Sequence, residues 1–319
     1  MEEKLRYDYI RRTSSTQGWA LLVYLGILNV AVICAVFVEL FAELFRYIGE
    51  SHFGESVPLG FDSGWGYFLA IAGGALALRL WKKKGYCRTV VWQPGKPMKA
   101  GRFLAIVCVF FSVQMVAVVL SLAAQSILRA MGYQTVDMGS VSTDSWSMFL
   151  YVGLGAPISE EILFRGLVLR TMEPFGKKFA IVTSALLFGL FHGNLSQAPF
   201  AFGVGLILGY VALEYNVGWA MVLHMLNNLT LSDTLYRLLG YLPGYWGDLW
   251  FWGILLAFTI AAVVILTANR KRIGAYLRGD WDDPLAYRAF FRAPGVITLM
   301  VVLLLSIGLT TAMSIMPIG

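Results

Sequence analysis

Six polar residues with chemically useful side chains stand inside strongly apolar segments of this chain. They are Glu160, Glu161, Arg165, His192, His224 and Asn228. An ionisable group at the middle of a bilayer costs roughly 2.5–3.5 kcal/mol on insertion scales, so each of these groups needs a reason to be there. Carboxylates, imidazoles and an amide are the groups that hydrolysis by an activated water uses.

The two neighbouring glutamates are predicted to have different roles. Glu161 and Arg165 are four positions apart, so on a helix they share a face and can form an ion pair. Glu160 is rotated by about 100° from Glu161 and is predicted to be free for catalysis. Pro157 removes the backbone N–H that would bond to Gly153, which predicts a kink one turn before the glutamates. A buried salt bridge between helices would explain Glu161 and Arg165 but not Glu160.

Two of the three histidines lie in apolar segments. His192 ends the sequence Phe188-Gly-Leu-Phe-His192, and Asn228 follows His224 by four positions and shares its helix face. A lone histidine on an apolar helix is more often a hydrogen-bonded core residue, but two of them with a spare glutamate favour a site. At 1.5 Å per residue, Glu160, His192 and His224 lie about 15, 21 and 12 Å from the cytoplasmic ends of their segments, which predicts one shared cavity.

Two hydrolytic mechanisms fit these residues. In the first, Glu160 is the general base that activates a water and His192 assists it. His224 and Asn228 then donate hydrogen bonds to the oxyanion. In the second, Glu160, His192 and His224 bind zinc, with water as the fourth ligand. The chain has no H-E-x-x-H motif, so its pattern is not that of a zincin. The residues alone leave both mechanisms open.

The elements that must position these residues are nine apolar segments, several of them close to the roughly 20 residues that cross a bilayer. They are 18–45, 64–81, 103–125, 146–172, 178–193, 198–215, 217–232, 249–267 and 295–315. The short fifth to seventh segments could include a re-entrant pair, so eight or nine spans are expected. The predicted fold is all-α, a polytopic transmembrane helical bundle. Residues 1–319 are predicted to form a single integral-membrane domain, with the catalytic helices at 146–232.

Composition and charge also predict a membrane protein. The chain is 58% hydrophobic and 14% charged, whereas a soluble domain is about 25% charged. This argues against a soluble enzyme, a disordered chain and a nucleic-acid binder. With the N-terminus in the cytoplasm, 20 of the 25 Lys and Arg residues fall on the cytoplasmic side and 3 on the other, as the positive-inside rule requires. The net charge of +6 therefore reports orientation, and nine spans would place the C-terminus outside.

The cysteines give no sign of a metal site or a disulfide framework. They are Cys34, Cys87 and Cys108. No pair of them has the spacing of metal ligands, so all three are expected to be free thiols.

Three motifs in order on successive apolar segments resemble a known family. The motifs are E-E-x-x-x-R from Glu160 to Arg165, F-x-x-x-H ending at His192, and H-x-x-x-N from His224 to Asn228. They are similar to those of the CPBP or ABI family of CAAX-processing and bacteriocin-processing intramembrane proteases, which includes the type II CAAX prenyl endopeptidases. The resemblance covers about residues 146–232.

The resemblance implies an endopeptidase that cuts near the C-terminus of a membrane-associated peptide, which is prenylated in eukaryotic relatives. It implies that Glu160 activates the water, that His192 is its catalytic partner, and that His224 and Asn228 stabilise the oxyanion. The family is often labelled a metalloprotease, but structural work on relatives favours a glutamate-dependent mechanism without bound metal, and that version is preferred here.

Two other functions compete with an intramembrane peptidase. A non-catalytic membrane protein, such as a bacteriocin immunity factor or a scaffold, would use the same residues as a buried polar network. A proton-coupled transporter usually has repeated halves, and the sequence contains no such repeat. The peptidase is preferred, with the bilayer and a peptide or protein carrying a membrane-associated segment as partners. A bacterial cell membrane is the predicted location, while the substrate and the oligomeric state are not identified by the sequence.

Overall fold

The structure is a computed structural model that describes residues 1–318 except 54–62, 82–89, 136–144, 231–233 and 280–282. It is 86% helical, so the predicted all-α class is confirmed. The described strands are β1 (Tyr133–Thr135) and β2 (Ile315–Pro317), which pair antiparallel and bring Tyr133 opposite Pro317. Cys34 and Cys108 are free thiols, as predicted, and Cys87 lies outside the described residues.

Over the residues that the structure describes, each of the nine predicted apolar segments lies mainly in helix. Eight of these segments each correspond to one uninterrupted helix. The helices are α1 (Glu2–Phe53), α2 (Ser63–Trp81), α3 (Ala100–Ala130), α7 (Lys177–Phe191), α8 (Ala198–Glu214), α9 (Val217–Thr230), α11 (Trp246–Ala268) and α14 (Pro294–Ser314). The segment 146–172 is divided into α4 (Trp146–Leu150), the π-helical η2 (Tyr151–Gly155), α5 (Ala156–Glu161), the π-helical η3 (Ile162–Leu169) and α6 (Arg170–Met172). The remaining short helices are η4 (Glu173–Phe175), α10 (Thr234–Gly240), α12 (Arg270–Arg278) and α13 (Pro284–Phe290).

Four of the described helices are long and apolar enough to cross a membrane. They are α1 (over Glu2–Ile48), α3, α11 and α14. Together with the shorter apolar helices, they make this an integral membrane protein. The predicted total of eight or nine spans is not confirmed by length and composition. Three of the predicted spans correspond to α7, α8 and α9. These helices have 15, 17 and 14 residues, fewer than the roughly 20 that a bilayer requires.

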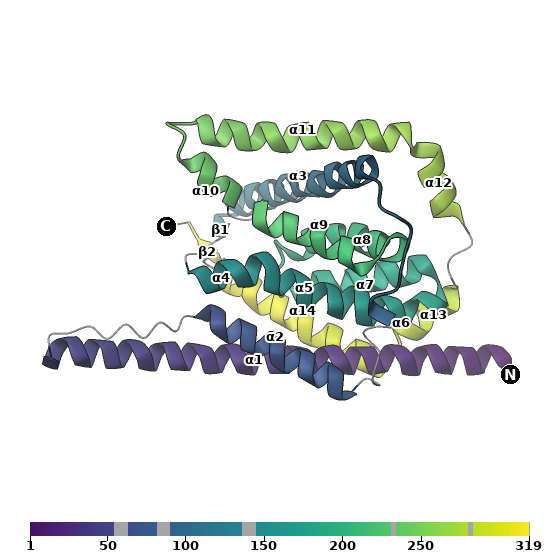
Figure 1. Cartoon of the computed structure of the whole chain (residues 1–319), viewed down its shortest axis with the longest axis horizontal. Helices are drawn as coiled ribbons and strands as arrows, with labels where there is room; N and C mark the ends of the chain where they lie inside the picture. The colour runs from purple at the N-terminus through teal and green to yellow at the C-terminus, as the bar shows by residue number, and fades with distance from the viewer. Residues whose placement is uncertain (54–62, 82–89, 136–144, 231–233, 280–282, 319) are drawn as a thin grey trace.

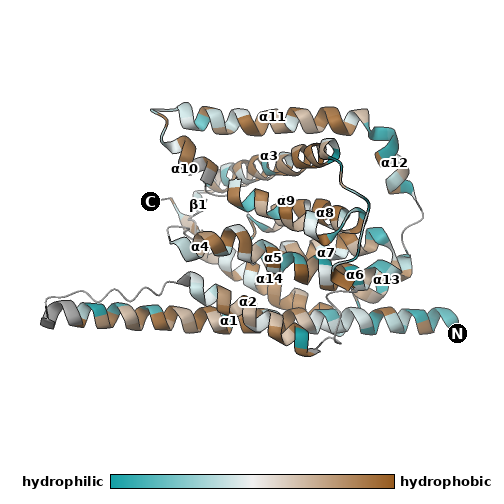
Figure 2. Cartoon of the chain, in the orientation of Figure 1, coloured by the Kyte–Doolittle hydropathy of each residue, from teal (hydrophilic) through white to brown (hydrophobic). Residues whose placement is uncertain are grey.

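The long helices surround the short ones (Figure 1). Helices α7, α8 and α9 lie between α3 and α11 on one side and α1 and α2 on the other. The outer helices are hydrophobic over most of their length, while α12 and the first turns of α1 are hydrophilic (Figure 2). Large apolar side chains on α1, α3, α11 and α14 are exposed, which is what lipid contact requires. The short central helices therefore have outer helices on two sides.

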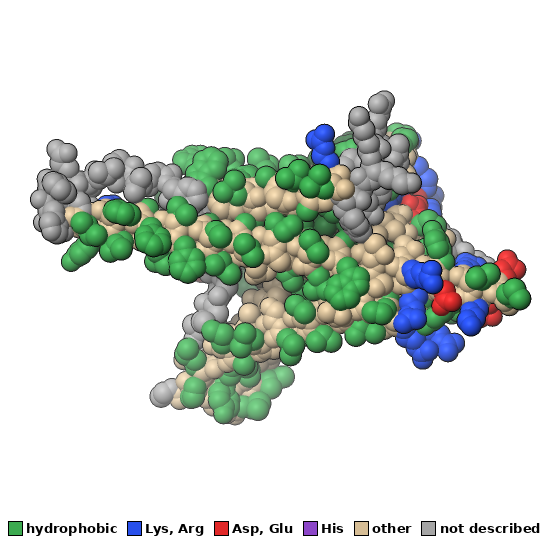
Figure 3. Space-filling view, turned by 90° about the horizontal axis from the view of Figure 1, so that it is seen from below, with side chains coloured by type: hydrophobic (Ala, Val, Ile, Leu, Met, Phe, Trp, Pro, Cys, Tyr) green, Lys and Arg blue, Asp and Glu red, His purple; other side chains and the backbone are tan. Residues whose placement is uncertain are grey.

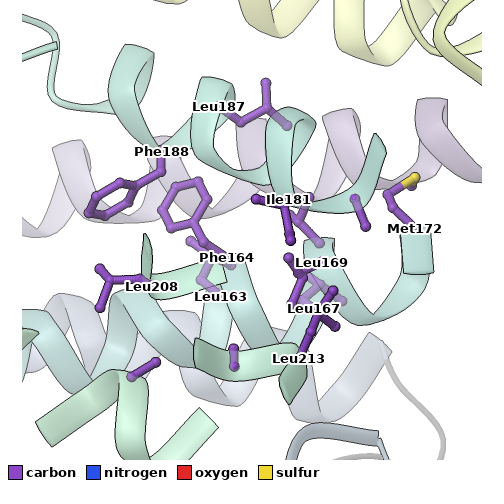
Figure 4. Close-up of a cluster of buried hydrophobic side chains, with 14 of the residues drawn as sticks. Leu163, Phe164, Leu167, Leu169, Met172, Ile181, Leu187, Phe188, Leu208 and Leu213 are labelled. Atoms are coloured by element: carbon purple, nitrogen blue, oxygen red, sulfur yellow. The ribbon is translucent and has the colours of Figure 1, made fainter. Parts of the chain in front are cut away.

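The buried core lies where α7 and α8 pack on η3 (Figure 4). Phe164 of η3 and Phe188 of α7 are each 1% exposed, with ring centroids 5.2 Å apart. Gly205 of α8 permits this packing, because a Cβ there would lie 3.1 Å from the Cβ of Ala185 and 3.2 Å from Phe188. Small residues at such positions let helices approach closely. This packing holds η3, which carries Arg165, against α7, which ends one residue before His192.

Candidate active site

Pro157 makes the helix that carries Glu160 irregular. The amide of Ala156 bonds to the carbonyl of Tyr151 five residues earlier, which is π-helical pairing. In that register the next donor would be residue 157, paired with the carbonyl of Val152. Proline has no N–H, so Val152 receives no hydrogen bond from this position. The irregularity predicted at Pro157 therefore takes the form of π-helical turns on both sides of α5.

Asn228 supplies the donor that Pro157 lacks. Its side-chain nitrogen Nδ2 donates to the carbonyl of Val152 at 2.8 Å. Helix α9 can come this close because residue 153 is glycine, where a Cβ would meet Leu229 at 2.4 Å. The amide thus joins α9, which carries His224, to the helix that carries Glu160. The sequence predicted Asn228 as a site residue, but not this partner.

The predicted pair of Glu161 and Arg165 is present and completely buried. Nε of Arg165 lies 3.2 Å from Oε2 of Glu161, and both side chains are 0% exposed. The guanidinium also lies over the ring of Phe188, with Cζ 4.3 Å from the centroid. Its Nη2 donates to the carbonyl of Gly205 at 3.5 Å. A cation–π contact and a carbonyl compensate part of the cost of burying this charge.

Replacing Arg165 by lysine is expected to lower the free energy of unfolding by about 1–3 kcal/mol, because the compact ammonium cannot keep the ring and carbonyl contacts together with the ion pair. Thermal unfolding in detergent measures the loss. Arg102→Lys is the matched control, since Arg102 is exposed and such surface changes stay within about 0.5 kcal/mol. An equal effect of both variants would show that the buried contacts of Arg165 carry no stability.

His224 lies between the two glutamates. Its Nδ1 is 3.0 Å from Oε1 of Glu161, and its Nε2 is 3.8 Å from Oε2 of Glu160. A carboxylate can only accept, so the hydrogen bond assigns a proton to Nδ1. The separation of 3.8 Å is too long for a direct hydrogen bond. Glu161 thus orients the imidazole, and Nε2 faces the carboxylate of Glu160.

Exposure rises across the site. The side chain of Glu161 is 0% exposed, that of His224 is 7%, and that of Glu160 is 30%. Of the two glutamates, Glu160 is therefore the one that a substrate or a water can reach. This agrees with the predicted division of roles between them.

His192 is the C-cap residue of α7, and it is exposed. Its Nδ1 is 2.9 Å from the carbonyl of Phe188, so the described contacts leave Nε2 as the available nitrogen. The ring of Phe188 meets both imidazoles edge-on, with centroids 4.9 Å from His192 and 5.7 Å from His224. Among the described residues, no hydrogen bond or ion pair joins His192 to Glu160. Among the described residues, the imidazole that lies beside the Glu160 carboxylate is that of His224.

Two site features were not predicted from sequence. The contact of Glu161 with His224 joins residues 63 positions apart, and no local pattern signals it. Phe188 was predicted only as a motif residue, yet its ring contacts Arg165 and both histidines. An aromatic residue four positions before His192 was the available signal, since residues at that spacing share a helix face.

Zinc binding by Glu160, His192 and His224 stays a prediction. Among the described residues, no three His, Cys, Asp or Glu side chains are arranged to hold one metal ion. Zinc ligands lie about 2.0–2.2 Å from the ion. The Nδ1 atoms of His192 and His224 contact Phe188 and Glu161, which leaves the two Nε2 atoms as the nitrogens that a metal could use.

The fold and the site define an integral membrane protein with a screened carboxylate–histidine centre. Residues 142–230 match the model of a family described as type II CAAX prenyl endopeptidase Rce1-like. This match covers the segment that carries the three motifs and supports their resemblance to the CAAX proteases. No curated protein and no solved structure matches the chain.

Proposed function

We propose that this protein is an intramembrane endopeptidase that hydrolyses a peptide bond of a membrane-associated substrate. The observation that carries the proposal is the position of His224, which Glu161 orients and which faces the partly exposed Glu160. The family segment supports a CAAX-protease type of activity. A histidine fixed by one carboxylate and facing a second one is an arrangement that suits general acid–base catalysis.

In the proposed reaction, Glu160 removes a proton from a water whose oxygen attacks the substrate carbonyl carbon. The carbonyl oxygen becomes an oxyanion, and His224 in its doubly protonated form donates to it from Nε2. Collapse of the intermediate breaks the C–N bond, and the amine leaves with the proton that Glu160 returns. His192, whose ring also contacts Phe188, is proposed to assist through its available Nε2.

Asn228 receives a different role from the one that the resemblance implies. Its amide nitrogen already donates to Val152, so we assign it to positioning rather than to the oxyanion. Glu161 and Arg165 are likewise assigned to positioning, because both are completely buried. Glu160, His192 and His224 remain the groups proposed to contact substrate.

A non-catalytic scaffold is the alternative. It would be held together by the same network of Glu161, Arg165 and His224. A purely structural network does not require a fourth ionisable group that is only partly buried. Glu160 is such a group, because its side chain is 30% exposed. The exposure of Glu160 therefore favours hydrolysis over a purely structural role.

The substrate is found by comparing the membrane peptides of cells that carry the wild type with those of cells that carry Glu160→Gln. A peptide that accumulates uncut only in the variant is a substrate. In vitro, a fluorogenic peptide with a prenylated cysteine three residues from its C-terminus is compared with its non-prenylated form. Identical peptide profiles in the two strains, with no cleavage of either probe, would reject the proposed activity.

We also propose that the chain crosses the bilayer nine times, with the N-terminus in the cytoplasm. Two observations support this. The termini lie at opposite ends of the molecule (Figure 1), and Lys and Arg side chains gather at the N-terminal end (Figure 3). The positive-inside rule makes the basic end cytoplasmic. The bacterial location stays a prediction.

Reporter fusions are expected to map this topology. A cytoplasm-active reporter should be active after residue 12 and after residue 272, and a reporter active only outside should respond after residue 316. Each fusion is repeated with the complementary reporter as its control. A C-terminus on the same side as residue 12 would exclude nine crossings.

A further inference from the structure

Helix α12 begins where α11 ends, at Asn269. The side chain of Asn269 donates to the carbonyl of Ile265 at 2.8 Å, and its own carbonyl accepts from Ile273 at 2.9 Å. One residue therefore ends α11 and begins α12. Figure 1 shows α12 turning away from α11 and running across the direction of α11 and α3.

The charge of α12 is entirely positive. Four of its nine residues are basic and none is acidic. The basic residues are Arg270, Lys271, Arg272 and Arg278. All four are exposed, and no residue of α12 is buried. In the part of the chain that the structure describes, no carboxylate forms an ion pair with any of them.

Tyr276 attaches α12 to the end of the bundle. Its hydroxyl donates to Oε1 of Glu214 at 3.4 Å, and its ring centroid lies 5.5 Å from that of Tyr210. Glu214, the last residue of α8, is held in turn by Lys96 and Lys177. The tyrosine face of α12 is thereby fixed on the protein, while its cations remain exposed.

The position of α12 relative to the bilayer follows from α11. That helix is a candidate span that ends at Ala268, and three consecutive cations begin two residues later. Cations are strongly disfavoured in hydrocarbon, so the boundary of the apolar layer must lie near residue 268. A basic helix that runs across the spans at this depth lies in the headgroup layer. The same end of the molecule carries the N-terminus and its basic residues (Figure 3).

We propose that α12 is a binding site for anionic glycerophospholipids, whose headgroup phosphates pair with its four exposed cations. Charge complementarity selects this occupant, because anionic headgroups are the anions concentrated in the layer where α12 lies. Phosphate oxygens accept the multiple N–H donors of guanidinium groups with good geometry. The site is independent of the proposed peptidase activity.

The test uses the full chain in nanodiscs of phosphatidylcholine, with and without phosphatidylglycerol. The anionic lipid is expected to raise the midpoint of thermal unfolding by roughly 3–6 °C, and high salt is expected to shrink the rise. Replacing Arg270, Lys271 and Arg272 together by glutamine should abolish the rise. A second variant exchanges arginine and lysine at the same three positions, as R270K, K271R and R272K. It keeps the charge of the helix and should therefore keep the rise in the unfolding midpoint.

Each outcome decides the proposal. A rise of the same size in the glutamine variant would overturn it, because anionic lipid would then act elsewhere. A rise produced in neutral nanodiscs by inorganic phosphate alone would also overturn it, because the site would then recognise a free anion. The wild-type rise, its loss in the glutamine variant and its retention in the charge-preserving variant support it. None of these measurements depends on whether a peptide is cleaved.

Discussion

Glu160→Gln is expected to lower peptide cleavage about 10²–10⁴-fold, the usual contribution of a general base. Glutamine has nearly the same shape as glutamate but cannot take a proton from water. The loss should appear in kcat and in kcat/KM to the same extent, because the proton transfer occurs only in the transition state. The measurement is steady-state cleavage of the fluorogenic peptide or of a substrate identified in cells.

The same variant is expected to fold normally. The closest described charged partner of Glu160 is Nε2 of His224, which lies 3.8 Å away, so no short hydrogen bond is broken. Arg165 and His224 both keep Glu161 as their partner, so no buried cation is left uncompensated. Abundance in the membrane and the midpoint of thermal unfolding should match the wild type.

Glu161→Gln is the matched comparison because it makes the same chemical change one residue away. Glu161 is completely buried against Arg165 and His224. Removing its charge leaves the guanidinium unpaired, which typically costs about 3–5 kcal/mol of folding stability. Glu160→Gln should therefore lose activity and keep its stability, whereas Glu161→Gln should lose both activity and stability. Full activity of Glu160→Gln would refute its role as the base.

The sequence predicted those parts of the molecule that depend on local spacing. Apolar length located every helix of the predicted core, and the i, i+4 relation gave the pair of Glu161 and Arg165 that the structure contains. The backbone N–H that Pro157 lacks also predicted an irregular helix at this position. These features follow from the geometry of a single helix, so neighbouring residues suffice to predict them.

The features that the sequence did not predict depend on how separate helices meet. The contact of Glu161 with His224 requires the packing of α9 against α5, and no spacing rule within one helix reports it. The π-helical register around Pro157 also cannot be read from residue type alone. The predicted partnership of Glu160 with His192 remains a prediction, since the described contacts of these residues are with His224 and Phe188.

Asn228→Ala is expected to reduce cleavage about 100-fold, because a displacement of about 1 Å at a catalytic centre has an effect of that size. The variant removes the hydrogen bond from Asn228 to the Val152 carbonyl. The carbonyl then lacks this partner, and η2 is no longer joined to α9 by this bond. The displaced group is Glu160, which lies two turns further along the same helix. The steady-state rate of the variant and its thermal unfolding are measured together.

Restoring the missing backbone donor distinguishes positioning from direct catalysis. In Pro157→Ala, residue 157 regains an N–H that can donate to Val152 in the register set by Ala156 and Tyr151. Asn228→Ala should then cost no more than about tenfold in activity, because a near-native geometry persists without the amide. The unfolding midpoint should likewise fall less in the alanine background than in the proline background.

Asn216→Ala provides the control in the same helix. Oδ1 of Asn216 accepts from the amide of Trp219 at 3.0 Å, at the start of α9. Its loss should lower stability by about 1 kcal/mol, as for other helix caps, and leave cleavage unchanged. An equal loss of cleavage from Asn228→Ala in both backgrounds would mean that the amide acts on the substrate itself. A rescue by Pro157→Ala instead assigns Asn228 to the backbone defect that a single proline creates near Glu160, the proposed general base.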